Sequence, residues 1–105
     1  MLISTTDAVV GKEIVETIGL VKGNSVQSRN IGRDMMAGLR NIVGGEMKEY
    51  AEMLTRSREL ATKTMVDEAR QLGANAIVGV RFSTSSVMDG TSEVLAYGTA
   101  VRLKE

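Results

Sequence analysis

The chain has 105 residues with 13 basic and 13 acidic side chains, and therefore no formal net charge. A chain of this length is expected to form one domain over residues 1–105, and its charge balance argues against nucleic-acid binding. It has no cysteine and no histidine, which excludes disulfides, cysteine–histidine zinc sites and thiol or imidazole catalysis. Because it shows no signal peptide and no apolar run of about 18 residues, we expect a cytoplasmic protein without membrane contact.

The first part of the chain predicts extended structure followed by a helix. Residues 1–4 could form an edge strand, and residues 13–28 form a β-rich run that two glycines interrupt. We interpret this run as one long bent strand, and the alternative is a hairpin that turns at residues 22–24. An apolar stripe then predicts a first helix over residues 31–43, which Gly44 ends.

Residues 46–72 predict one long amphipathic helix. The segment has no proline or glycine and is rich in strong helix formers. Its apolar residues recur at spacings of three, four or seven and so share one face: Met47, Tyr50, Leu54, Ala61, Met65, Ala69 and Leu72. Met53 and Leu60 lie outside this stripe, and they either contact another copy or are isolated exposed residues. Gly73 ends the helix.

A β-hairpin is predicted at the end of the chain. Its strands are residues 75–87 and 91–103, and Asp89-Gly90 lies at the turn. With this turn at the centre, Phe82 is predicted to pair with Tyr97, and the face that carries both is predicted to pack on the long helix. The opposite face would then hold small residues together with two arginines, Arg81 and Arg102.

Together these segments predict an α+β fold with the element order β-α-α-β-β. Right-handed connections and short loops favour a three-stranded antiparallel sheet of order 1-3-2 with both helices on one face. One face of this sheet would remain uncovered, so we expect copies of the chain to associate with one another.

Metal binding would need donors other than thiolate and imidazole. Thioethers could bind a soft metal, but helix packing explains the positions of Met35, Met47 and Met65. Glu46 and Glu49 could bind a hard cation if several chains brought their carboxylates together. The alternative is that these two acids only complement the positive end of a helix dipole.

A small ligand or another copy could contact four further candidates: Glu46, Tyr50, Asn75 and Arg81. Asn75 either binds a ligand or belongs to the turn before a strand, and Arg81 with Arg102 could bind a carboxylate of a ligand or of another copy. An enzyme that uses Glu46, Tyr50 and Arg81 in a cleft between copies is the alternative to a non-enzymatic protein. No spacing in the chain identifies an acid–base pair.

Several short segments carry a family resemblance. They are Gly44-Gly45-Glu46 with Tyr50, the run GANAIVGVRF over residues 73–82, and YGTAV over residues 97–101. On these segments the whole chain resembles the YbjQ family, also called UPF0145 or DUF74, whose members are labelled as heavy-metal binding. The resemblance implies a dodecin-like α+β subunit in a ring-shaped homopentamer. We therefore expect a non-enzymatic homo-oligomer that binds a metal or a small ligand between its subunits.

Overall fold

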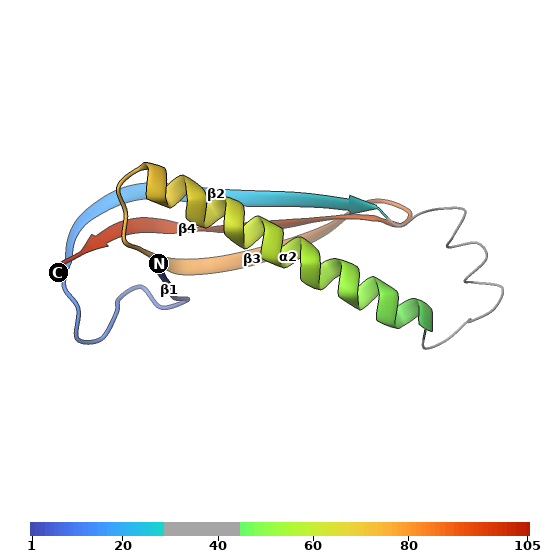
Figure 1. Cartoon of the computed structure of the whole chain (residues 1–105), viewed down its shortest axis with the longest axis horizontal. Helices are drawn as coiled ribbons and strands as arrows, with labels where there is room; N and C mark the ends of the chain where they lie inside the picture. The colour runs from blue at the N-terminus through green and yellow to red at the C-terminus, as the bar shows by residue number, and fades with distance from the viewer. Residues whose placement is uncertain (29–44) are drawn as a thin grey trace.

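The computed structural model describes residues 1–28 and 45–105, and in the second range it describes side chains from residue 48 onward. Within these residues one long helix lies across one face of a four-stranded sheet (Figure 1). The elements are β1 (Leu2–Ile3), β2 (Ile14–Ser28), α2 (Gly45–Gln71), β3 (Ala76–Met88) and β4 (Thr91–Leu103). The helix predicted over residues 31–43 lies outside the described residues.

The sheet is mixed, and its strands lie in the order β1-β3-β4-β2. Strand β1 is parallel to β3, whereas β4 is antiparallel to both β3 and β2. The predicted fold, β-α-α-β-β with a three-stranded antiparallel sheet of order 1-3-2, was therefore wrong, because the described residues form one helix and four strands. Residues 1–4 could form an edge strand, but the predicted sheet did not count it, because the two residues of β1 are too few to show a periodic pattern.

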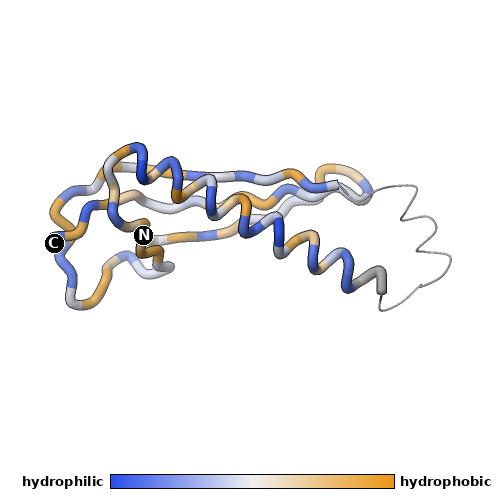
Figure 2. The backbone as a smooth tube through the Cα atoms, in the orientation of Figure 1, coloured by the Kyte–Doolittle hydropathy of each residue, from blue (hydrophilic) through white to orange (hydrophobic). Residues whose placement is uncertain are grey.

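The predicted long helix is confirmed, and α2 differs from the predicted range by one residue at each end. Apolar and polar residues alternate along it with the helical period (Figure 2). At its end the Ala74 N–H donates to the Ala69 carbonyl and the Gly73 N–H donates to the Arg70 carbonyl, both at 3.0 Å. This is a Schellman motif, and Gly73 adopts the required positive φ of 87°. The helix is too polar to qualify as a membrane span.

The main core lies between α2 and the two strands β2 and β4, and α2 hardly touches β3. Ala61, Met65 and Ala69 of the helix are fully buried there. They pack on residues of all three long strands, namely Val21, Ile77, Val80, Val94, Ala96 and Ala100. A Cβ added to Gly23 would lie 2.6 Å from the Met65 backbone nitrogen and 2.9 Å from the Thr64 Cβ. The absence of a side chain at Gly23 therefore lets the helix approach β2 closely.

The predicted hairpin of β3 and β4 is confirmed, with Asp89-Gly90 between its strands, but its predicted register was wrong. Phe82 pairs with Ala96, and Arg81 pairs with Tyr97. Directly paired residues point to the same side of a sheet. Phe82 therefore lies on the helix side with Ala96, while Tyr97 lies on the side away from α2, which we call the reverse face.

Two shifts in the strand pairing cause this change of register. One lies between Ser86 and Met88 beside the hairpin turn and places Phe82 opposite Ala96, and the other is a β-bulge between Val78 and Arg81. At the bulge Gly79 has a φ of 61°, and its N–H donates to the Thr6 carbonyl at 2.8 Å. The extra residue reverses the side to which the first part of β3 points. Four residues of the face that was predicted to pack on the helix instead form a second core on the reverse face with the N-terminal segment: Ala76, Val78, Val101 and Leu103, against Val9 and Ile14.

Candidate functional site

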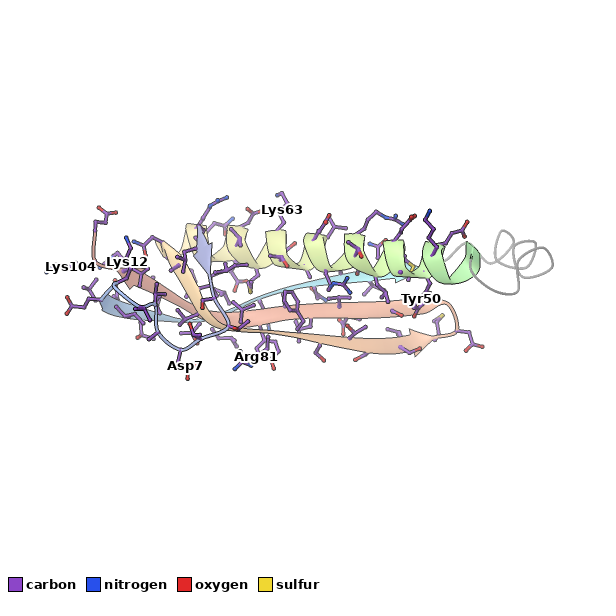
Figure 3. The ribbon with its side chains drawn as sticks, turned by 90° about the horizontal axis from the view of Figure 1, so that it is seen from below. Asp7, Lys12, Tyr50, Lys63, Arg81 and Lys104 are labelled. Carbon is purple, nitrogen blue, oxygen red and sulfur yellow. The ribbon has the colours of Figure 1, made fainter. Side chains whose placement is uncertain are left out.

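Two of the predicted candidates, Tyr50 and Arg81, lie on opposite sides of the sheet (Figure 3). Tyr50 lies between α2 and the sheet, where its hydroxyl oxygen is 2.8 Å from Ser92 Oγ. Arg81 lies on the reverse face. Glu46 belongs to the first turn of α2, and its side chain lies outside the described part of the structure. The sheet therefore keeps Tyr50 and Arg81 from forming one site within a single chain.

The third candidate, Asn75, joins the ends of two strands. Its Oδ1 accepts a hydrogen bond from the Leu103 N–H at 2.7 Å, and its Nδ2 donates to the Leu103 carbonyl at 3.0 Å. Its own N–H donates to the Val101 carbonyl at 3.2 Å. These bonds extend the β3–β4 pairing by one step beyond the strands themselves, so the geometry gives Asn75 a role in the fold.

Three side chains form a row across the reverse face, and this row is the best candidate for a binding site. Tyr97 of β4 is paired with Lys22 of β2 on one side and with Arg81 of β3 on the other. The Cβ atoms of directly paired residues are about 5 Å apart. The Tyr97 side chain therefore stands between those of Lys22 and Arg81, and we call this arrangement the Lys22–Tyr97–Arg81 row.

The positive charges of this row have no acidic partner in the described part of the chain. Arg81 Nη1 instead donates to the carbonyls of Thr5 and Val80, each at 2.9 Å, which holds the guanidinium beside the N-terminal segment. Tyr97 is 37% exposed, and the side chains of Lys22 and Arg81 are exposed as well. An aromatic ring between two unpaired cations can bind a molecule that carries a carboxylate or a phosphate.

Arg102, predicted to share a face with Arg81, lies on the helix side of the sheet. Its Nη2 is 2.6 Å from the Glu16 carboxylate, so its carboxylate partner comes from its own chain. The prediction failed because it took no account of the register shift between Ser86 and Met88, which places Tyr97 and not Gly98 opposite Arg81. The same omission hid Lys22 and Tyr97.

The described residues do not fit a soft heavy-metal ion. The whole sequence lacks cysteine and histidine, the side chains that such ions prefer. Met53 and Met65 are buried at positions about 18 Å apart along α2, and Met88 is exposed beside the hairpin turn. Over residues 1–28 and 45–105, no group of three acidic side chains is placed to hold a metal ion.

Comparison with known proteins gives a consistent family. The family model YbjQ_1, described as "Putative heavy-metal-binding", matches residues 1–104. A UPF0145 protein of Vibrio parahaemolyticus is 59% identical over all of both chains. A UPF0145 protein of Thermus thermophilus is 53% identical over 99% of this chain and 91% of its own length.

One solved structure also has a similar fold. It is the crystal structure of a DUF74-family protein of unknown function from Pediococcus pentosaceus, with a TM-score of 0.68 and 18% sequence identity. The match covers 99% of this chain and 98% of that one. At this level of identity the likeness concerns the fold alone.

Proposed function

Since the chain belongs to the YbjQ family, also called UPF0145 or DUF74, we propose that it is a non-enzymatic homo-oligomer that binds a small anionic molecule between its copies. The observation that carries this proposal is the Lys22–Tyr97–Arg81 row, in which two cations without an acidic partner among the described residues stand on either side of an exposed ring. The family resemblance implies five copies, and we adopt that number.

Self-association is supported by the apolar residues that surround the row. Leu20 is 66% exposed, Val26 is 56% exposed and Leu95 is partly buried. All three lie on the reverse face, Leu20 on one side of the row and the other two on its other side. Single exposed apolar residues are common, but several on one sheet face are typical of a surface that a partner covers. An assembly in which the reverse faces of the copies turn toward one another would shield these residues and would lower the polarity around the two cations.

The chemical class of the ligand follows from the donors in the row. Arginine binds carboxylate and phosphate groups through paired N–H donors, and lysine adds a second positive charge. Tyr97 offers a ring face for stacking and a hydroxyl for hydrogen bonding. The described residues hold no soft-metal donors other than the separated methionines, so we assign the site to a small organic or inorganic anion.

The assembly is tested by native mass spectrometry of the untagged chain at micromolar concentration. We expect a single closed oligomer, and five copies would agree with the proposed number. A monomer at this concentration would overturn the proposal.

Ligand binding is tested with inorganic phosphate and citrate by isothermal titration calorimetry. Arg81→Gln and Lys22→Gln should each weaken binding about tenfold or more, since a hydrogen bond to a charged group contributes about 1.5–3 kcal/mol. Arg102→Gln is the matched control, because it removes a cation from the other face and should leave binding unchanged. Equal losses in all three variants, or no binding by the unmodified chain, would refute the proposed ligand class.

A further inference from the structure

We infer that neighbouring copies join edge to edge, with β2 of one copy paired in parallel with the outer half of β3 of the next copy. In this arrangement Leu60 of one copy packs on Phe82 of the next. The inference rests on the proposed self-association and adds to it a defined interface, which can fail while self-association stands.

Among the described residues, the outer half of β3 is a strand edge that no other strand pairs with. The N-terminal segment covers only its first half, where β1 pairs with Ala76 and Ile77 and the Val80 N–H donates to the Ser4 carbonyl at 2.9 Å. No described strand pairs with the outer edge of residues 82–88, and this stretch contains no charge, proline or glycine. Exposed strand edges normally carry such residues, which prevent pairing with other chains. The composition of residues 82–88 therefore favours a strand partner.

The opposite edge of the sheet, β2, has the direction that this pairing needs. Both β2 and β3 are antiparallel to β4, so they run parallel to each other. A rotation about an axis along the strands would place β2 of one copy beside β3 of the next, and repetition of this step closes a ring. On the outer edge of β2 the Lys22 N–H donates to Glu68 Oε1 at 3.3 Å. This exposed bond can be exchanged for strand pairing.

Leu60 and Phe82 lie at the same level along the sheet. Gly23 and Phe82 both pair with Ala96, so the three form one row across the strands. The backbone of Ala61 lies directly above Gly23, which places the neighbouring Leu60 over the same row. If the next copy lies beside the first by the width of one sheet and at the same level along the strands, Leu60 of one copy therefore meets Phe82 of the other.

Leu60 also points in the required direction. Arg58 and Thr62 border Phe82 on the β3 side of α2, and a helix turns about 200° over two residues. Leu60, two residues from each, therefore points past β2 toward the neighbouring copy. It is 48% exposed and Phe82 is 47% exposed, so each can bury further apolar surface. Met53, the other residue assigned to this contact from the sequence, is 5% exposed and belongs to the core of its own chain.

The flank of α2 offers space for this contact. A groove of about 510 Å³ lies between the helix and β3, lined by Thr55, Arg58, Glu59, Thr62, Lys63 and Phe82. The helix has 27 residues and is therefore about 40 Å long, so the contact can continue along the strand edge on both sides of Leu60.

A charge exchange tests the contact between Leu60 and Phe82. Leu60→Lys and Phe82→Glu alone should each raise the dissociation constant of the oligomer at least tenfold, measured by light scattering on dilution. The double variant should recover most of the loss, because the new lysine meets the new glutamate of the next copy. Val10→Lys is the control, since Val10 is fully exposed and lies outside this interface. Circular dichroism checks that each variant is folded.

Cross-linking locates the contact independently, because the natural chain contains no cysteine. Leu60→Cys chains mixed with Phe82→Cys chains and a short bis-maleimide should give a covalent dimer. Either variant alone, or Val10→Cys mixed with Phe82→Cys, should give none. An oligomer that shows neither this cross-link nor the charge rescue would overturn the interface and leave self-association intact. A monomeric natural chain would overturn both.

Discussion

Replacing Gly23 by alanine should separate the long helix from the sheet. The new Cβ would meet three atoms of α2, including the Met65 nitrogen at 2.6 Å and the Thr64 Cβ at 2.9 Å. The third atom, the Ala61 carbonyl oxygen, is closer still and belongs to the helix backbone. A backbone atom cannot rotate away as a flexible side chain can, so α2 must move away from β2.

The expected loss of stability follows from two opposing effects. Overpacking of a core costs about 1–3 kcal/mol, and the rigid contacts at Gly23 place this variant near 3 kcal/mol. Gly23 does not have a positive φ, so alanine fits the backbone at this position. Alanine also lowers the conformational entropy of the unfolded chain, which stabilises the folded state by about 0.4–1 kcal/mol. The net loss is about 2 kcal/mol. It should lower Tm by roughly 8–16 °C for a domain of this size.

Urea unfolding followed by circular dichroism, at one fixed protein concentration, measures this loss. Gly19→Ala is the control, because Gly19 lies in the same strand and has no atom within 4 Å of an added Cβ. Its cost is conformational, since Gly19 has a φ of 145°. Gly23→Val should cost more than Gly23→Ala. If Gly23→Ala costs no more than Gly19→Ala, the close packing of α2 on β2 is not what requires glycine there.

Three further substitutions test single interactions by thermal unfolding. Asn75→Ala should cost about 2 kcal/mol, since it removes both bonds to Leu103; an unchanged Tm would show that these bonds add no stability. Tyr50→Phe should cost about 1 kcal/mol through the lost hydroxyl contact with Ser92, and Ser92→Ala in that background should add little if the two hydroxyls act together. The hydrogen bond from Lys63 lowers the pKa of Asp67; desolvation opposes this effect, and the charges of Lys63 and then of Arg70 add to the lowering. A carboxylate whose pKa is lowered by folding stabilises the fold at pH values above its ordinary pKa. The natural chain should therefore lose its higher Tm relative to Asp67→Asn as pH falls below about 4. A difference in Tm that stays constant between pH 7 and pH 2 would contradict this assignment.

Local sequence patterns identified the long helix and the hairpin turn because both depend on residues close together in the chain. The helix formers and apolar spacing of residues 46–72 describe α2 almost completely. Asp89-Gly90 needs no distant partner to form its turn. The predicted sheet topology failed because β1 has only two residues, and its pairing with Ala76 and Ile77 joins distant parts of the chain.

The register failed at two places. A shift between Ser86 and Met88 places Arg81 opposite Tyr97, and the bulge at Gly79 shifts the pairs of residues 76–78. The Gly79 N–H donates to the Thr6 carbonyl, a partner more than seventy positions earlier, and no local pattern in β3 contains Thr6. Of the candidate site, Arg81 could be selected from the sequence, whereas Lys22 and Tyr97 join its row only when the shift beside the hairpin turn is known.

The positions of the two termini have a practical consequence. In Figure 1 both ends of the chain lie in the half of the molecule away from the hairpin turn. Fluorescent proteins fused at either end would thus be attached far from the tip of that hairpin. In an assembly of equivalent copies they would gather at one rim, where stepwise photobleaching could count them and energy transfer between them could report subunit exchange.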